Sequence, residues 1–114
     1  MMAKVDGEMI GIYQKVLEKF KELLAARTPL RSVILFGSWA RGDADLYSDV
    51  DVLVILDNTA NEQDREIVSE CAWEAGFDAG IIVAPVVFTR DEWEKGPERA
   101  SLLAQAVKAE GVRL

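Results

Sequence analysis

The stretch FGSWARGDADLYSDVDVLVI, residues 36–55, contains the end of one apolar segment, a polar segment bounded by glycines, and a second apolar segment. The second apolar segment opens with two acids, Asp49 and Asp51, separated by a single valine. Acidic residues are unfavourable in strands, and like charges on one strand face repel each other. The pair is therefore the first place in the chain to look for a function.

The spacing of apolar residues around this stretch predicts alternating helices and strands. Thr28-Pro29 ends the first helix, Gly76 stands where a C-terminal helix cap belongs, and Pro85 places the third strand at an edge or a bulge. The predicted elements are a helix over 9–24, strands over 32–36 and 50–56, a helix over 60–75, a strand over 81–88, a helical turn over 91–95, a helix over 98–110 and a short edge strand over 112–114. This order predicts an α/β (α+β) fold, a small mixed sheet with helices packed against it, in which residues 1–114 form a single domain.

Composition excludes several classes of protein. The net charge of −7, from 20 acids and 13 bases, argues against strong direct binding to nucleic acid, which depends on Lys and Arg. No apolar run approaches the roughly 20 residues of a membrane span. The absence of histidine removes the usual serine and cysteine triads, and the single cysteine, Cys71, removes an internal disulfide. One cysteine also fits the reducing cytoplasm, where we expect the protein to be located.

Asp49 and Asp51 point to the same face of the predicted strand, with Cα atoms roughly 6.5–7 Å apart. Two carboxylates at this spacing can converge on one or two divalent ions, and oxygen ligands suit Mg²⁺ or Mn²⁺. A lone D-x-D at the start of a strand is more often simply solvated. The pair is informative here because Gly37-Ser38 precedes it with ten residues in between, and a predicted strand lies on each side.

The segment after the first strand predicts a phosphate-binding turn. Gly37 lets a ligand approach the backbone closely. The residues from Ser38 to Arg41 can form a turn of helix whose free N–H groups, with the Ser38 hydroxyl, face a phosphate. Arg41 is placed to meet phosphate oxygens. Metal on one side of a triphosphate and N–H groups on the other is the arrangement that nucleotidyl transfer requires, because that chemistry consists mainly of positioning and charge neutralisation.

The combination of Gly37-Ser38, ten intervening residues and Asp49-x-Asp51 resembles the signature of the DNA polymerase β-like nucleotidyltransferase superfamily. The short chain, the Arg41-Gly42 pair and Ser48 resemble its minimal nucleotidyltransferase branch. The resemblance implies transfer of a nucleoside monophosphate, most simply AMP from ATP, to an acceptor hydroxyl. It also implies Mg²⁺ (or Mn²⁺) held by the catalytic acids Asp49 and Asp51, and a nucleoside triphosphate bound by Gly37, Ser38, Arg41 and Ser48.

Active members of that superfamily usually carry a third carboxylate on a following strand. The matching run here, residues 80–84, contains no acid. Asp78 lies just before that run and becomes a third catalytic acid only if the strand starts early. The simpler interpretation of Asp78 is a solvated aspartate in a turn.

Proteins of the minimal branch are typically paired with a small helical HEPN-domain protein in toxin–antitoxin systems, where the nucleotidyltransferase is the antitoxin. The resemblance therefore implies a HEPN-type partner that carries the acceptor hydroxyl. The missing third carboxylate supports an alternative, a catalytically weak or inactive binding module that neutralises or scaffolds a helical partner. Metal-dependent glycosyltransferases also use a D-x-D, but their catalytic domains are usually far longer. The sequence leaves a homo-oligomer open.

Overall fold

Strand β2 (Val50–Leu56) lies inside the sheet, and six of its seven residues are buried. A continuous run of Val, Leu and Ile suits such a strand because both of its faces are covered. It pairs antiparallel with β1 (Leu30–Phe36) and parallel with β3 (Val83–Thr89), and β4 (Val112–Arg113) pairs antiparallel with the far edge of β1. The strand order is β3-β2-β1-β4, so the predicted small mixed sheet is confirmed, and so is the edge position of the strand that contains Pro85.

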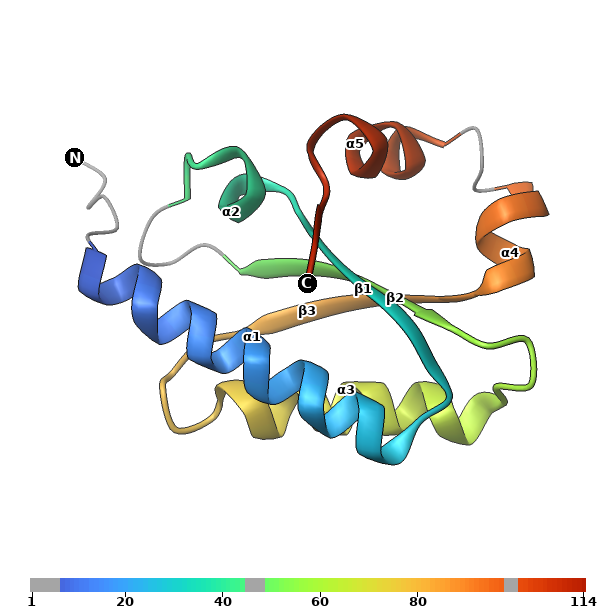
Figure 1. The fold of residues 1–114 in the computed structure, drawn as a ribbon, viewed down its shortest axis with the longest axis horizontal. Helices are drawn as coiled ribbons and strands as arrows, with labels where there is room; N and C mark the ends of the chain where they lie inside the picture. The colour runs from blue at the N-terminus through green and yellow to red at the C-terminus, as the bar shows by residue number, and fades with distance from the viewer. Residues whose placement is uncertain (1–6, 45–48, 98–100) are drawn as a thin grey trace.

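The computed structural model describes residues 7–44, 49–97 and 101–114. Its helices lie on both faces of the sheet, with α1 and α3 on one face and α4 and α5 on the other (Figure 1). Within the described residues, no helix combines the length and the apolar character that a membrane span requires. The helices are α1 (Gly7–Arg27), α2 (Ser38–Arg41), α3 (Glu62–Gly76), α4 (Arg90–Lys95) and α5 (Leu102–Glu110).

The larger core lies between the sheet and the α1–α3 layer. Phe20 and Leu24 of α1 are fully buried in it, together with Val68 and Cys71 of α3. Full burial of a large aliphatic or aromatic side chain contributes about 1.5–3 kcal/mol. Helix α1 ends where the amide and the hydroxyl of Thr28 both donate to the carbonyl of Leu24, at 2.9 and 2.7 Å, before a proline that cannot continue the helix.

A smaller core lies on the opposite face of the sheet, under α4 and α5. Leu53 and Ile55 of β2 are buried there with Val107 of α5, and Phe88 and Trp93 pack against them. Side chains alternate along a strand, so Asp51 belongs to this same face, two residues before Leu53. The acids at the start of β2 therefore face the α5 layer and not the α1–α3 layer.

Most predicted elements are confirmed, but the role predicted for Gly76 was wrong. Gly76 is the last residue of α3, and its φ is not positive. The C-cap is the next residue, Phe77, which has a right-handed helical conformation. Glycine is required there by a close backbone approach, because a Cβ would lie 2.0 Å from the carbonyl oxygen of Ile81. The left-handed residue of this turn is Gly80, at φ 67°. Helix α5 is described only from Leu102, so the first three residues of the predicted helix over 98–110 lie outside the described residues.

Candidate active site

Asp49 and Asp51 lie at the entry of β2. Asp49 is exposed just before the strand, and Asp51 is half-buried and pairs with Phe36 on β1 and with Ala84 on β3. The position is fixed by the apolar run that follows, because shifting the strand by one residue would turn Leu53 and Ile55 away from their core. The acids are therefore held at one end of the sheet by the packing of the strand behind them.

The two acids are close enough to influence each other. Burial raises the pKa of Asp51 above its ordinary value, the charge of Asp49 raises it further, and the charge of Arg41 partly opposes both. Negative charge that is buried and faces a like charge opposes folding in the absence of a cation. The pair is therefore a place where a bound cation would relieve repulsion.

Gly37 joins the acids to the predicted phosphate-binding turn. Its backbone has φ 76° and ψ −156°, a conformation that is essentially restricted to glycine. A Cβ on Gly37 would lie 2.4 Å from Oδ2 of Asp51, so the carboxylate rests against the bare Cα of the glycine. This contact puts the turn and the acids at one corner of the sheet.

The predicted turn of helix is α2, which begins at Ser38 and is followed by Gly42 in the left-handed conformation, at φ 81°. The amide of Arg41 donates to the carbonyl of Gly37 at 3.0 Å. In any helix the first N–H groups have no carbonyl partner within the helix, so those of α2 point out of its start. Trp39 stacks on Tyr13 of α1, with ring centroids 3.6 Å apart, and this contact packs α2 against α1.

Arg41 is held by two carboxylates. Its Nε donates to Oδ2 of Asp43 at 3.1 Å, and its Nη1 donates to Oε1 of Glu110 at 3.2 Å. Hydrogen bonds to Asp43 and then to Glu110 raise the pKa of the guanidinium, which stays charged. Glu110 was not foreseen from the sequence, because it lies 69 residues from Arg41 and is the last residue of a helix with no motif around it.

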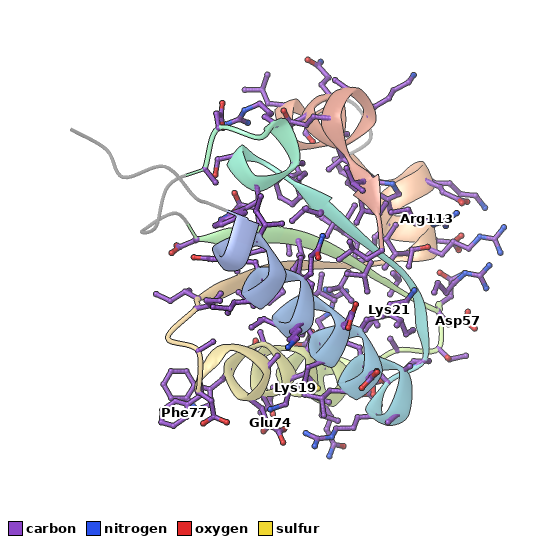
Figure 2. All side chains as sticks on the ribbon, turned by 60° about the vertical axis from the view of Figure 1, so that its left-hand side comes forward. Lys19, Lys21, Asp57, Glu74, Phe77 and Arg113 are labelled. Carbon is purple, nitrogen blue, oxygen red and sulfur yellow. The ribbon has the colours of Figure 1, made fainter. Side chains whose placement is uncertain are left out.

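The structure does not bring Asp78 to the other two acids. Asp78 is exposed in the turn after α3, where it lines a surface depression with Lys19 and Glu74. Figure 2 shows its neighbour Phe77 on the same side of the molecule as those two residues, in the α1–α3 layer. Because Asp51 faces the α5 layer, Asp78 is separated from it by the sheet. In the part of the chain that the structure describes, no three acidic, cysteine or histidine side chains form a group that could hold a metal ion.

The structure therefore brings together Gly37, Ser38 and Arg41 with Asp49 and Asp51, and it leaves Asp78 apart. Ser48 lies outside the described residues. A pair of carboxylates fits a divalent ion such as Mg²⁺, which usually takes one or two carboxylates together with substrate phosphates. Asp49 and Asp51 are the residues that would hold it.

Comparison with known proteins decides the family. A family model described as a nucleotidyltransferase domain matches residues 14–107, which include both strands and the turn of the site. The chain belongs to the nucleotidyltransferase domain family. This family is the one that the motif in residues 36–55 predicted.

Individual nucleotidyltransferases resemble the chain over most of its length. A candidate protein adenylyltransferase of Methanocaldococcus jannaschii is 30% identical over 78 residues, which cover 67% of this chain and 79% of that protein. The structure of a candidate nucleotidyltransferase from Sulfolobus solfataricus has a TM-score of 0.62 at 23% identity, and the match covers 99% of this chain and 90% of that one. The structure of an MNT antitoxin in complex with a tri-AMPylated HEPN toxin of Shewanella oneidensis has a TM-score of 0.54 at 23% identity. This match covers 88% of this chain and 69% of that one. At these identities the two solved structures support the fold.

Proposed function

We propose that this nucleotidyltransferase transfers AMP from ATP to a hydroxyl group of a small helical HEPN-domain protein, and that it acts as the antitoxin of that partner. The observation that carries the proposal is the close approach of Gly37 and Asp51, because the turn that we propose to bind phosphate then adjoins the acids that we propose to hold the metal ion. Two relatives support it, one a candidate protein adenylyltransferase and the other an MNT antitoxin in complex with an AMPylated HEPN toxin.

In this proposal the turn binds the triphosphate of ATP. The bare Cα of Gly37 lets phosphate oxygens approach the backbone, and the N–H groups and hydroxyl at the start of α2 donate to them. Arg41 adds a fixed positive charge beside the acids. Ser48 is proposed as a further nucleotide-binding residue from the sequence motif alone.

Asp49 and Asp51 would hold Mg²⁺ or Mn²⁺ on the other side of the triphosphate. A divalent ion there supplies positive charge to the phosphate oxygens during transfer. Burial raises the pKa of Asp51 and the charge of Asp49 raises it further, so a cation bound beside the two carboxylates would stabilise their charged form.

The acceptor oxygen attacks the α-phosphorus, and the bond from this phosphorus to the oxygen that bridges to the β-phosphate breaks. AMP is then attached to the acceptor, and pyrophosphate leaves. The acceptor proton needs a base. Asp78 lies apart from the pair, and among the described residues no third acid forms a metal-holding group with it. We propose that this base comes from the partner protein, which would make transfer dependent on the complex.

One observation favours the alternative function, an inactive binding module. Ala84 occupies the position on β3 directly beside Asp51, on the same face of the sheet, where a neighbouring strand would place a third carboxylate. A protein that has lost this acid can keep nucleotide binding and partner binding without transfer.

The single-domain organisation of residues 1–114 and a cytoplasmic location remain predictions from the sequence.

The test uses the chain co-expressed with a small helical HEPN-domain protein, chosen from the genes adjacent to its own. The purified complex is incubated with Mg²⁺ and ATP labelled at the α-phosphate, and in parallel with ATP labelled at the γ-phosphate. Label on the partner from the α-position alone, lost in the Asp49→Asn and Asp51→Asn variants, would support AMP transfer. Nucleotide binding without label on the partner would support the binding module. A chain that binds no nucleotide would overturn both.

A further inference from the structure

Glu110 contacts the turn that we propose to bind the triphosphate. Its Oε1 accepts hydrogen bonds from the backbone N–H of Gly37 at 3.3 Å and from Nη1 of Arg41 at 3.2 Å. The Glu110 side chain is only 18% exposed, whereas that of Arg41 is 47% exposed. Hydrogen bonds in which one partner is charged are the stronger ones, and partial burial reduces their screening by water and salt. The carboxylate therefore ties together both ends of α2.

Glu110 itself stands on a fixed support. Val112 pairs with Leu35, so the antiparallel register places Glu110 opposite Gly37. Gly111, which lies between Glu110 and Val112 in the sequence, packs tightly against β1. A Cβ on this glycine would lie 2.9 Å from Cγ2 of Ile34.

The residues that follow extend this support along β1. The N–H of Leu114 donates to the carbonyl of Val33 at 2.9 Å, and Lys21 of α1 donates to the carbonyl of Leu114 at 2.7 Å. Arg113 donates to the Ser32 hydroxyl at 2.8 Å, and Figure 2 labels Lys21 and Arg113 in this region. The backbone around Glu110 is therefore fixed to two neighbouring elements.

We propose that Glu110 is a positioning residue for triphosphate binding, an inference that rests on the proposed function. With Asp43 on Nε and Glu110 on Nη1, the planar guanidinium of Arg41 is held from two sides. A planar group held in this way presents its remaining donors in one direction. Glu110 also holds Gly37 in the conformation that brings its bare Cα against Asp51. The sheet edge thus fixes the shape of the turn before any nucleotide binds.

The negative charge of Glu110 would also repel a triphosphate bound nearby. The opposite hypothesis is therefore that Glu110 weakens ATP binding. If Glu110 merely occupied the place of a phosphate, the nucleotide would have to displace it, and removing it would strengthen ATP binding. The fixed backbone of Glu110 and the full charge of Arg41 favour positioning over displacement. The two hypotheses predict changes of opposite sign, so one measurement separates them.

The experiment compares wild type with Glu110→Ala and Glu110→Gln by calorimetry with ATP and Mg²⁺. Glutamine keeps the size and one acceptor oxygen but loses the charge. We expect ATP affinity to fall about tenfold or more in Glu110→Ala and by less in Glu110→Gln, since a lost charge-assisted hydrogen bond usually has that effect. In the Arg41→Ala background, Glu110→Ala should have little further effect, because the two residues act as a unit.

Chemical-shift titration with adenosine, which has no phosphates, tests whether the effect belongs to the turn. Adenosine binding should stay unchanged in the variants. Glu74→Gln serves as the matched control, because Glu74 pairs with Arg27 at 2.8 Å on the α1–α3 layer, away from the turn. Equal losses of ATP and adenosine binding, or ATP binding as tight as wild type in Glu110→Ala, would overturn the proposal.

Hydrogen exchange of the Gly37 amide separates this inference from the proposed function. In the nucleotide-free protein the amide should exchange faster in Glu110→Ala than in wild type, whatever the protein binds. If wild type binds no ATP while the exchange difference is present, the proposed function fails and the structural contact stands. If the Gly37 amide exchanges at the same rate in both proteins, the positioning contact itself is contradicted.

Discussion

The carboxylate of Asp51 rests against the Cα of Gly37, at a distance that leaves no room for a side chain on the glycine. The two residues come from neighbouring antiparallel strands, in which Asp51 pairs with Phe36, the residue before the glycine. A strand register set by apolar packing thus determines how far a phosphate-binding turn lies from a pair of acids. The site depends on this register as much as on its own residues.

Substituting Gly37 should damage both stability and binding. In Gly37→Ala, the new Cβ meets the Asp51 carboxylate, and the backbone at φ 76° is strained for any other residue. We expect a loss of about 1–3 kcal/mol from the backbone conformation alone, and loss of ATP binding as Asp51 moves away. Urea denaturation and calorimetry would measure the two effects.

Gly42→Ala is the matched control for that change. Gly42 also has a positive φ, at 81°, but a Cβ there meets nothing within 4 Å. It should show the backbone cost without displacing Asp51. If Gly37→Ala bound ATP as well as Gly42→Ala does, the contact with Asp51 would have no role in the site.

Removing a phosphate contact should weaken nucleotide binding selectively. Ser38→Ala and Arg41→Ala should each lower ATP affinity by about 1.5–3 kcal/mol, the usual contribution of a hydrogen bond to a charged group. Arg27→Ala is the control, because that arginine forms an exposed pair with Glu74 at 2.8 Å on the α1–α3 layer. Unchanged affinity in both site variants, measured by calorimetry, would remove the turn from the nucleotide site.

The raised pKa of Asp51 has a consequence for stability in metal-free protein. Between the ordinary aspartate pKa of about 3.9 and the raised value, the folded state binds more protons than the unfolded state. The free energy of unfolding contributed by this group therefore falls as pH rises through that window and stays lower above it. Asp51→Asn lacks this loss, so it should be more stable than wild type at neutral pH and should lose that advantage below pH about 4.

Asp49→Asn provides a comparison in the same urea experiment. It removes the second cause of the raised pKa and keeps the first, which is burial, so it should stabilise the metal-free protein by a smaller amount. Mg²⁺ should narrow or reverse both differences, because ligand binding stabilises wild type by about RT ln(1 + [L]/Kd). Should either variant instead lose a kilocalorie or more at neutral pH without metal, that carboxylate would be serving a structural hydrogen bond.

Asp78 and Ala84 are the two positions that bear on a third acid, and substitutions at them should have different effects. Because Asp78 is exposed on the α1–α3 layer, Asp78→Asn should leave AMP transfer and nucleotide binding unchanged. A transfer assay on the complex measures this directly. Loss of transfer in Asp78→Asn would mean that the turn after α3 rearranges to reach the site when the partner binds.

Ala84→Asp places an acid beside Asp51 on the neighbouring strand. Three acids at one place should lower the melting temperature of the metal-free protein and increase the rise on adding Mn²⁺. Ala84→Asn has nearly the same size without the charge, and it should show neither change. If both variants behaved alike in thermal denaturation, Ala84 would not face the metal site.

The sequence predicted those parts of the molecule that depend on local pattern. Strand β2 has the predicted limits, Val50 and Leu56, because the uninterrupted apolar run over 52–56 lies between the acid pair and Asp57-Asn58 and favours a strand. The turn from Ser38 to Arg41 likewise follows from glycines on both sides of a short segment. Long-range contacts were not accessible in the same way.

Gly76 and Glu110 illustrate the limit. A glycine near a helix end usually marks a left-handed cap. At position 76, glycine is needed instead because the backbone carbonyl five residues later lies too close for a Cβ. Glu110 reaches the turn only because two residues of β4 set the register with β1. No local pattern encodes a pairing between residues 73 positions apart.

Strand β4 consists of two residues, yet it is what holds the end of α5 against the sheet. Removing residues 112–114 would take away the exposed Val112 and Arg113 and the half-buried Leu114 at the margin of the larger core, so circular dichroism should change little. The same cut would remove the strand pairing that places Glu110 opposite Gly37. The turn over residues 37–41 would then lose the contact that fixes its shape. A protein preparation nicked at this end could therefore look intact and well folded while having lost affinity for ATP.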